Sequence, residues 1–367
     1  MNKEKIFIIA GEDSGDLHGA KLIESIKKIN PFAEFIGIGG IKMQGAGLKA
    51  TEHIKNLNVI GIFEVIKHYP RIKKIFNQTL DEIKKEKPDK IILIDYPGFN
   101  LRLAKKLKSL DFHVTYFILP QVWAWKESRA KSLDENCNKL ISIIPFEKSW
   151  FAKKGINVHY AGHPLAKLSN HSYDREKFCI KHNIPLNNKI ILLMPGSRRA
   201  EIKRHWTIFE DSAKILFSKR GDLSFVLVEG QNVSINPDID LIKIKKNQYE
   251  AINLADAAII CSGTATLEAT MLRCPMIVCY KLSSATWFLA KILSKVEYLS
   301  LSNLIAKEEV VKEYLQNDMN AKNLSDGVIN LLKKGEKDIL MKKYQKLINK
   351  LKNDQNPYDS AARYIYD

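Results

Sequence analysis

The chain has 367 residues, a length that exceeds the usual size of one hydrophobic core and favours two domains. Its hydrophobic and charged contents, 45% and 27%, are ordinary for a soluble globular protein, and the sequence contains no short-period repeat or low-complexity segment. The net charge of +17 predicts attraction to an anionic partner, either nucleic acid, a phosphorylated substrate or an acidic membrane surface. Solvated basic faces are the alternative, and no nucleic-acid-binding module is recognisable in the sequence.

The cysteine pattern and the lengths of the apolar runs bear on the compartment. The cysteines show no paired spacing, which is typical of reduced thiols in a cytosolic protein; they are Cys137, Cys179, Cys261, Cys274 and Cys279. The first apolar run is shorter than a signal-peptide core, and no window approaches the ~18 apolar residues of a membrane span. We therefore expect a cytoplasmic protein that is soluble or bound to a membrane peripherally.

Apolar runs of strand length alternate with amphipathic stretches along most of the chain. In the first half these runs are residues 5–10, 35–40, 89–95, 114–119 and 139–144, and the first amphipathic helix is expected over 16–29. In the second half the runs are 189–194, 223–228, 256–261 and 275–280, with helices over 199–219 and from about 264. Continuous apolar strands separated by helices indicate parallel sheets covered on both faces.

A segment rich in Gly, Pro, Ser, Asn and His, residues 162–174, interrupts the pattern and reads as a linker. The predicted fold is therefore α/β, with two doubly wound Rossmann-like domains facing a cleft. We expect the first domain over 1–165 and the second over 166–335. Beyond about residue 307 the pattern indicates helices only, and those of 336–367 are expected to pack on the first domain.

Ligands of open α/β sheets bind beyond the carboxyl ends of the strands, so the residues that follow each strand are the candidates for a site. Small residues and a helix start follow the run that ends at Cys261. Small side chains let backbone N–H groups approach a ligand, and a helix N-terminus carries about half a positive charge. This segment therefore predicts a diphosphate site with a ribose ligand one turn into the helix, formed by Ser262, Gly263, Thr264, Ala265 and Glu268. The alternative is an ordinary capped helix.

A second turn, Pro-Gly-Ser followed by two arginines, comes after the strand over 189–194. Such a turn exposes backbone N–H groups, and a guanidinium can bind diphosphate oxygens with two hydrogen bonds. The candidate residues are Gly196, Ser197 and Arg198. Arg199 and Arg204 lie farther along and are as readily explained as surface cations.

Standard nucleotide and metal motifs are absent from the sequence. "GDLHGAK" lacks the P-loop spacing and "GIGGIKMQG" lacks the third glycine of the dinucleotide fingerprint. His159 and His163 have the spacing of a zinc pair, but Gly and Pro in "HYAGHP" argue against the helix that this pair needs. Asp238 and Asp240 form a DxD that does not follow an apolar strand and reads as a solvated loop. We predict no metal and no cofactor.

Carboxylates gather after two strands of the first half. Asp95 ends the run over 89–95, at the carboxyl end of the expected strand, where burial could make it a general base. The segment "GEDSGDLHGA" places Glu12, Ser14, Asp16 and His18 after the first strand. Helix capping by these acids is the alternative. Diphosphate-binding groups in one half and a proton acceptor in the other indicate group transfer.

Aromatic residues accompany these acids. The stretch over 59–76 is a basic amphipathic helix containing Phe63 and Tyr69, which suits either a membrane interface with acyl chains or an ordinary covering helix. Trp123 and Trp125 in "PQVWAWKESR" could stack on a sugar or anchor at an interface, although core packing is the commoner role of tryptophan.

These segments together resemble the lipid-A-disaccharide synthase family. The matching blocks occur in the family's order from residue 10 to about 306; they include "AGEDSGDLHGA", "VIGIFEV", "IDYPGFNLRLAKKLK", "LPQVWAWKESR", "IPFEKSWF", "AGHPL", "LLMPGSRRAEI", "SGTATLEATM", "CPMIVCYK" and "YLSLSNLIA". One departure is Gly98, where some members carry a second Asp, so Asp95 is the one acid of its block.

The resemblance implies an inverting GT-B glycosyltransferase that needs no metal. Such an enzyme moves 2,3-diacylglucosamine from UDP to the 6-hydroxyl of 2,3-diacylglucosamine 1-phosphate and releases UDP, giving the β-1,6-linked disaccharide of lipid A. It implies work at the anionic cytoplasmic face of the inner membrane, no nucleic-acid partner, and a possible homodimer. Glu12, Asp95, Arg198 and Asn303 match positions on which the family relies for activity.

With this resemblance, Asp95 is expected to accept the proton of the acceptor hydroxyl, and Arg198 with Ser262–Ala265 to stabilise the departing diphosphate. Glu268 would hold the ribose and Glu12 would orient a sugar. One alternative on the same architecture is a UDP-sugar epimerase or a transferase with a different lipid acceptor. The alternative from another class is a basic membrane- or nucleic-acid-binding protein without catalysis, which would show no saturable UDP binding.

Overall fold

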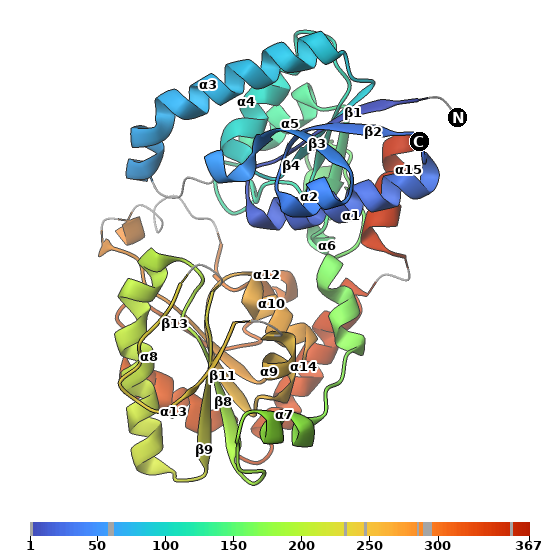
Figure 1. Ribbon diagram of the computed structural model, residues 1–367. Helices are drawn as coiled ribbons and strands as arrows, with labels where there is room; N and C mark the ends of the chain where they lie inside the picture. The colour runs from blue at the N-terminus through green and yellow to red at the C-terminus, as the bar shows by residue number, and fades with distance from the viewer. Residues whose placement is uncertain are drawn as a thin grey trace. The chain divides into compact units, whose positions relative to one another are not determined.

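The computed structural model describes residues 3–57, 62–230, 233–245, 248–284, 286–288, 296–352 and 355–367, the side chains of 62–67 excepted. The chain divides into two compact units (Figure 1). The first consists of Met1–Pro164 together with Asn353–Asp367, and the second is Leu165–Lys352. Each unit contains one parallel sheet with helices on both faces, which is the predicted α/β architecture.

The sheet of the first unit has the strand order β3-β2-β1-β4-β5-β6-β7 in the part of the chain described. Its strands are β1 (Lys5–Ala10), β2 (Glu34–Gly39), β3 (Leu48–His53), β4 (Lys90–Ile94), β5 (Val114–Phe117), β6 (Lys139–Ser142) and β7 (His159–Tyr160). Its helices are α1 (Asp13–Ile29), α2 (Ile41–Gly45), α3 (Ile62–Glu86), α4 (Pro97–Lys108), α5 (Arg129–Asn136), α6 (Pro145–Ala152) and α15 (Pro357–Tyr366), with a 3₁₀ turn at Ile54–Asn56.

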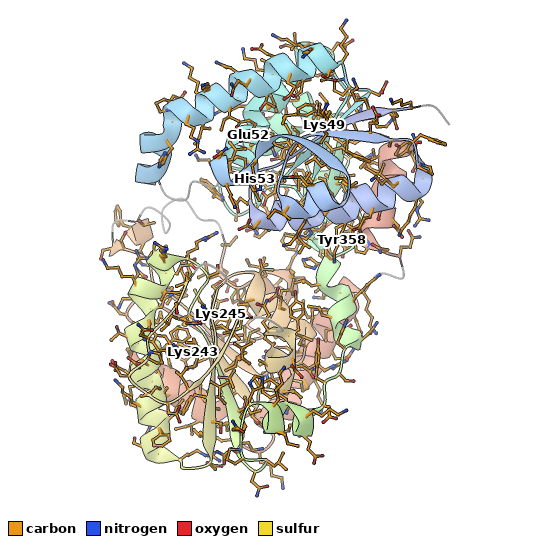
Figure 2. All side chains as sticks on the ribbon, viewed as in Figure 1. Lys49, Glu52, His53, Lys243, Lys245 and Tyr358 are labelled. Atoms are coloured by element: carbon orange, nitrogen blue, oxygen red, sulfur yellow. The ribbon has the colours of Figure 1, made fainter. Side chains whose placement is uncertain are left out.

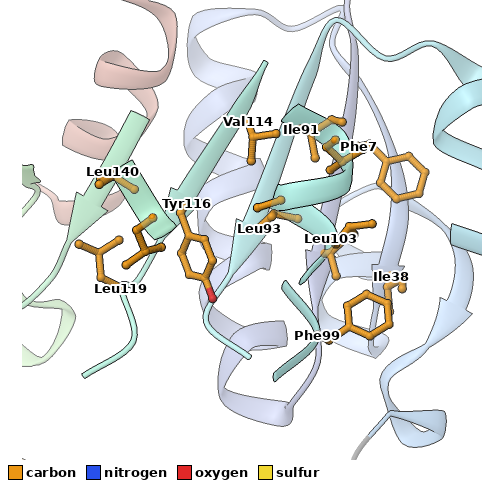
Figure 3. Close-up of a cluster of buried hydrophobic side chains, with 14 of the residues drawn as sticks. Phe7, Ile38, Ile91, Leu93, Phe99, Leu103, Val114, Tyr116, Leu119 and Leu140 are labelled. Carbon is orange, nitrogen blue, oxygen red and sulfur yellow. The ribbon is translucent and has the colours of Figure 1, made fainter. Parts of the chain in front are cut away.

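Alternate residues of each central strand point to opposite faces of the sheet, and both faces are buried. Phe7 and Ile9 of β1 pack with Leu93 and Tyr116 in one core beneath α3, α4 and α5 (Figure 3). Ile6 and Ile8 pack in a second core with α1 and α15. This two-sided burial explains why these strands read as continuous apolar runs.

The sheet of the second unit has the order β10-β9-β8-β11-β12-β13 among the described residues. Its strands are β8 (Lys189–Met194), β9 (Leu223–Val228), β10 (Ile242–Ile244), β11 (Ala257–Cys261), β12 (Met276–Tyr280) and β13 (Glu313–Leu315). Its helices are α7 (Arg175–Lys181), α8 (Arg199–Lys219), α9 (Gln248–Leu254), α10 (Thr264–Met271), α12 (Leu301–Ala306), α13 (Ala321–Leu331) and α14 (Glu336–Leu351). A 3₁₀ segment, Pro164–Asn170, begins at the junction of the units.

The C-terminal residues divide between the two units, which corrects the expectation that 336–367 pack together on the first domain. Helix α14 belongs to the second unit, where the buried Tyr344 donates a hydrogen bond to the carbonyl of Cys274 at 3.0 Å. Only the last segment joins the first unit, because α15 buries Ala361, Ala362 and Ile365 against α1. The apolar side chains of α14 pack in a core of the second unit, and those of α15 pack in a core of the first. The boundary between the two units therefore lies between these helices.

The nine apolar runs all form strands. In the part of the chain that the structure describes, the four strands that the sequence did not indicate are the outer strands of the two sheets: β3, β7, β10 and β13. An outer strand has one neighbour and is short or polar. Figure 2 shows Lys49, Glu52 and His53 on β3, and Lys243 with Lys245 at β10. Strand β13 corrects the expectation that only helices follow residue 307.

Candidate functional site

A pocket of about 350 Å³ opens at the carboxyl ends of β8, β9 and β11 in the second unit. All eight residues predicted to bind a UDP-sugar line it: Gly196, Ser197, Arg198, Ser262, Gly263, Thr264, Ala265 and Glu268. The other lining residues were not predicted: Met194, Glu201, Val228, Glu229, Gly230, Gln248 and Cys261. The position agrees with the general rule for ligands of open parallel sheets.

One wall of the pocket is the first turn of α10, which begins immediately after β11. This turn carries no acidic side chain, so its N–H groups and the positive end of the helix dipole are not neutralised locally. Ser302 of α12 holds the helix from behind by hydrogen bonds to the carbonyl of Thr266, at 3.1 Å, and to Thr270. The arrangement suits an anion such as a diphosphate.

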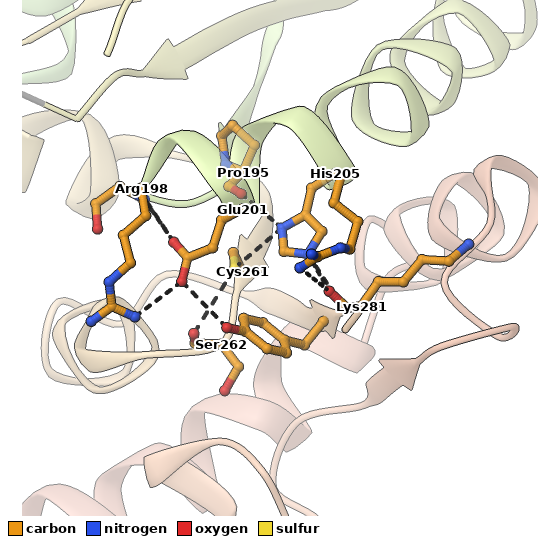
Figure 4. Close-up of polar contacts among 10 residues, drawn as sticks. Pro195, Arg198, Glu201, His205, Cys261, Ser262 and Lys281 are labelled. Atoms are coloured by element: carbon orange, nitrogen blue, oxygen red, sulfur yellow. Dashed lines mark hydrogen bonds and ion pairs between the residues drawn. The ribbon is translucent and has the colours of Figure 1, made fainter. Parts of the chain in front are cut away.

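A second wall is formed by Gly196, Ser197 and Arg198 of the turn Pro195–Arg198 between β8 and α8. Gly196 has φ +125°, a conformation that favours glycine, and a Cβ at this position would lie 2.7 Å from a carboxylate oxygen of Glu201. That oxygen accepts hydrogen bonds from the amides of Ser197 and Arg198 at 3.2 and 3.3 Å (Figure 4). Glu201 also pairs with the Arg198 guanidinium at 3.3 Å. Glu201 is the third residue of α8, a position from which a Glu side chain often accepts from the amide that precedes the helix, and this position is the signal that sequence reasoning missed.

Behind this wall, the buried His205 joins three segments of the unit. Its Nδ1 lies 3.0 Å from the carbonyl of Pro195 and its Nε2 lies 3.1 Å from the carbonyl of Lys281 (Figure 4). The thiol of Cys261 lies 3.5 Å from Nδ1, and burial raises the pKa of this thiol. Cys261 is therefore a neutral part of the pocket wall rather than a thiolate nucleophile.

Glu268 lies one turn inside α10 and faces α9. Gln248 and Tyr249 donate hydrogen bonds to its two oxygens at 3.3 and 3.4 Å. Burial raises the pKa of the Glu268 carboxyl, while these two hydrogen bonds act in the opposite direction. The carboxylate is thus oriented at the pocket edge and suits a pair of hydroxyl donors.

Asn303 does not line the pocket in the described part of the chain. It is fully buried, and its amide group is saturated by the segment around β13. Its nitrogen donates to the carbonyl of Val311 and to Glu313, both at 2.8 Å, and its oxygen accepts from the amides of Val310 and Val311 at 2.8 and 2.9 Å. The structure therefore gives Asn303 a supporting position on α12, where it ties this helix to the segment that leads into β13.

In the first unit, Asp95 lies at the carboxyl end of β4 in a strained turn. Asp95 and Tyr96 both have positive φ, +44° and +49°. The carbonyl of Asp95 accepts hydrogen bonds from Tyr116, at 2.6 Å, and from Asn100, at 2.8 Å. Burial, and then the charge of Glu12, raises the pKa of Asp95 to about 6. Strain held by surrounding hydrogen bonds is frequent at functional sites.

The turn after β1 lies beside this aspartate. Glu12 is half-buried, and a Cβ on the neighbouring Gly11 would overlap the ring of Tyr96 at 2.2 Å. The small residue at position 11 therefore lets the two strand-end turns pack together. Ser14, in the first turn of α1, is exposed.

Asp16 and His18 have structural partners. The buried carboxylate of Asp16 accepts hydrogen bonds from the amides of Gly40, Lys42 and Met43 at 2.7 to 3.1 Å and so caps α2. His18 Nδ1 lies 2.9 Å from the hydroxyl of Tyr358 on α15, which Figure 2 labels. Burial lowers the pKa of His18 to about 4. Both side chains therefore have hydrogen-bond partners within the first unit.

The predicted aromatic residues differ in exposure. Trp123 is buried and donates from Nε1 to Glu147 at 2.8 Å, and burial raises the pKa of Glu147 to about 7. Trp125 is 43% exposed and stacks under Lys126 and Arg129. Tyr69 is exposed on α3. The side chain of Phe63 lies outside the described residues.

Within the described residues, no group of three or more His, Cys, Asp or Glu side chains is arranged to hold a metal ion. None of the helices described there has the length and apolar character needed to cross a membrane. The five cysteines are free thiols, and four of them are buried.

Comparison with known proteins assigns the family. The family model described as lipid-A-disaccharide synthetase matches residues 6–365. Lipid-A-disaccharide synthase 1 of Legionella pneumophila strain Lens is 38% identical over 341 residues, which is 90% of this chain and 88% of the relative. Lipid-A-disaccharide synthase of Trichlorobacter lovleyi is 33% identical over 341 residues, which is 91% of this chain and 89% of the relative.

Solved structures with the same fold include the glycotransferase of kitacinnamycin, with TM-score 0.66 and 12% identity over 100% of this chain and 99% of that chain. At this identity the likeness shows the GT-B fold alone. Because the family model spans nearly the whole sequence and the relatives exceed 30% identity, the chain belongs to the lipid-A-disaccharide synthetase family of glycosyltransferases.

Proposed function

We propose that this chain transfers 2,3-diacylglucosamine from its UDP carrier to the 6-hydroxyl of 2,3-diacylglucosamine 1-phosphate. The products are UDP and the β-1,6-linked disaccharide 1-phosphate. The family assignment supports lipid-A-disaccharide synthase activity, with a UDP-sugar donor and a lipid acceptor. The finer chemistry below rests on the contacts within each unit.

Asp95 is the proposed general base. The acceptor hydroxyl gives its proton to the Asp95 carboxylate as its oxygen forms a bond to the anomeric carbon, while the bond from that carbon to the diphosphate breaks. A single displacement of this kind inverts the anomeric centre. A pKa of about 6 keeps Asp95 mostly ionised near neutral pH yet makes it a stronger base than an exposed aspartate. This aspartate at its strained strand end is the observation that carries the proposal.

The leaving group is assigned to the pocket of the second unit. Negative charge grows on the diphosphate as the glycosidic bond breaks, and the Arg198 guanidinium with the first turn of α10 would stabilise that charge. Glu268, oriented by Gln248 and Tyr249, would accept the ribose hydroxyls. We propose that these groups act without a divalent metal, so that added chelator leaves the rate unchanged.

The acceptor side is assigned to the carboxyl edge of the first sheet. Glu12 would orient the acceptor sugar as well as acting on Asp95, and Ser14 and Trp125 are exposed groups at the same edge. We propose positioning roles for Asp16, His18 and Trp123, because each side chain has an internal hydrogen-bond partner. Asn303 has the same kind of role in the second unit.

The basic charge is assigned to peripheral binding at an anionic membrane surface, where both lipid substrates lie. Helix α3 supports this role, because it exposes Tyr69, Arg71, Lys73 and Lys74 on one stretch. Light scattering of the purified protein tests whether it forms a homodimer, which the sequence left open.

The test compares Asp95→Asn with the unchanged enzyme. A general base typically contributes 100-fold or more, so kcat should fall by at least about 100-fold while the affinity for UDP, measured by calorimetry, stays the same. A fall of less than about tenfold removes Asp95 from this role. UDP release without a lipid acceptor would instead favour a UDP-sugar epimerase.

A further inference from the structure

The charge balance of the second-unit pocket is unexpected for a diphosphate site. Among the described residues that line it, Arg198 is the one cation, whereas Glu201, Glu229 and Glu268 are acids. Glu229 is engaged elsewhere, because it accepts from the amide of Ile235 at 2.7 Å and pairs with Lys245 at 3.4 Å. Recognition of the diphosphate therefore depends strongly on where the guanidinium of Arg198 is held.

Glu201 is the residue that holds it. The carboxylate is 11% exposed and bonds to Arg198 twice, to the main-chain amide at 3.3 Å and to the guanidinium at 3.3 Å. Among the described residues it also accepts hydrogen bonds from the amide of Ser197, at 3.2 Å, and from the hydroxyl of Tyr280, at 3.3 Å. The Arg198 side chain is 51% exposed and, without this partner, would sample many rotamers.

The same contacts change how the Pro195–Arg198 turn can act. The amides of Ser197 and Arg198 would otherwise be free to bind an anion, but both donate to Glu201. The first turn of α10 has no such internal acid. The diphosphate is thus left to the guanidinium and to the start of α10, while Glu201 organises the turn from inside.

We propose that Glu201 is a positioning residue for the transfer reaction, which orients the Arg198 guanidinium toward the diphosphate of the donor. This inference rests on the proposed function, since it assumes that the pocket binds the UDP portion. Because the guanidinium contact strengthens as charge develops on the leaving group, the loss should appear mainly in kcat. Relief of repulsion between Glu201 and the diphosphate offsets part of any loss in ground-state affinity.

The experiment is a double-mutant cycle of Glu201→Gln and Arg198→Ala, with kcat and KM from transfer assays and the Kd of UDP from calorimetry. We expect Glu201→Gln to lower kcat about tenfold and to change the Kd of UDP by less than about threefold. In the Arg198→Ala background, Glu201→Gln should lower kcat by less than about twofold. A tenfold loss that persists in that background would overturn the inference, because Glu201 would then act independently of Arg198.

Two further variants control for folding. Glu210 lies on the same helix and is also buried, but its carboxylate accepts from the amide of Asp238, so Glu210→Gln should leave kcat unchanged. Tyr280→Phe removes one donor to Glu201 conservatively and should lower kcat about threefold, again only when Arg198 is present. If Glu201→Gln fails to fold, Tyr280→Phe decides, and an unchanged kcat there overturns the inference.

The two proposals fail differently. If the unchanged enzyme shows no saturable UDP binding, or if Arg198→Ala keeps full activity, the assignment of the pocket to the leaving group is wrong. If UDP binds, Arg198→Ala is impaired, and the cycle shows no coupling, only the role of Glu201 is wrong.

Discussion

Glu12 acts electrostatically on Asp95: after burial, its carboxylate is the next largest cause of the rise in the pKa of Asp95 to about 6. The two acids follow neighbouring strands, β1 and β4, which pair in parallel, so both leave the sheet at the same edge. A carboxylate kept close to a second carboxylate is harder to ionise and is a stronger base once ionised.

This relationship predicts the pH dependence of the reaction. The base form of Asp95 is lost as pH falls through its pKa, so kcat/KM should decline below about pH 6. Glu12→Gln removes the neighbouring charge and should shift this decline to lower pH. The adjacent and exposed Asp13 is the matched control, because Asp13→Asn removes one charge from the same turn. Equal shifts in both variants would mean that Glu12 has no specific effect on Asp95.

Asp95 also predicts a conflict between stability and activity. Its pKa is higher in the folded state than the ordinary 3.8, so the folded protein binds this proton more tightly than the unfolded chain. Ionisation therefore destabilises the fold, with an effect absent below about pH 4 and complete above about pH 6. Asp95→Asn should raise the free energy of unfolding at pH 7.5 by about 1–2 kcal/mol, allowing for partial solvent screening. Calorimetric unfolding at pH 7.5 and at pH 4 measures it, and a gain of equal size at both pH values would contradict the explanation.

We expect Asn303 to stabilise the folded protein and to affect catalysis only through that support. Asn303→Ala leaves the amides of Val310 and Val311 and the side chain of Glu313 without this partner, and should lower the free energy of unfolding by about 2–4 kcal/mol. Since α12 supports α10 through Ser302, the Kd of UDP should rise as well. The exposed Asn349 on α14 is the control, with less than about 0.5 kcal/mol expected for Asn349→Ala. Loss of activity with unchanged stability would instead favour direct contact with substrate.

Membrane binding should depend on particular lysines. Lys73→Ala with Lys74→Ala on α3 removes two exposed charges and should weaken binding to vesicles containing acidic lipid by up to about thirtyfold, at about 1 kcal/mol per charge near the surface. The matched control removes Lys105 and Lys106 of α4, which are also exposed. Vesicle sedimentation at low and high salt measures the membrane binding of both double variants. Equal losses would mean that net charge, rather than α3, determines binding.

The sequence by itself determined the inner strands and the composition of the second-unit pocket. Residues such as Ile190–Met194 are buried from both faces, which leaves an apolar run that is legible without the fold. The turns that follow β8 and β11 carry small residues for close approach, and this local requirement is also visible in sequence. Hence the eight predicted residues line one pocket.

Only the tertiary structure decided the outer strands and the partners of single polar residues. Strand β3, with Lys49 and Glu52, has one paired neighbour and no buried second face to impose an apolar pattern. Asp16 and Asn303 look like site residues in sequence, yet the Asp16 carboxylate accepts from amides at the start of α2 and the Asn303 side chain accepts from amides of the loop before β13. A hydrogen-bond partner is set by distances in space rather than by spacing along the chain, so whether a carboxylate meets a ligand or an amide is a property of the folded structure alone.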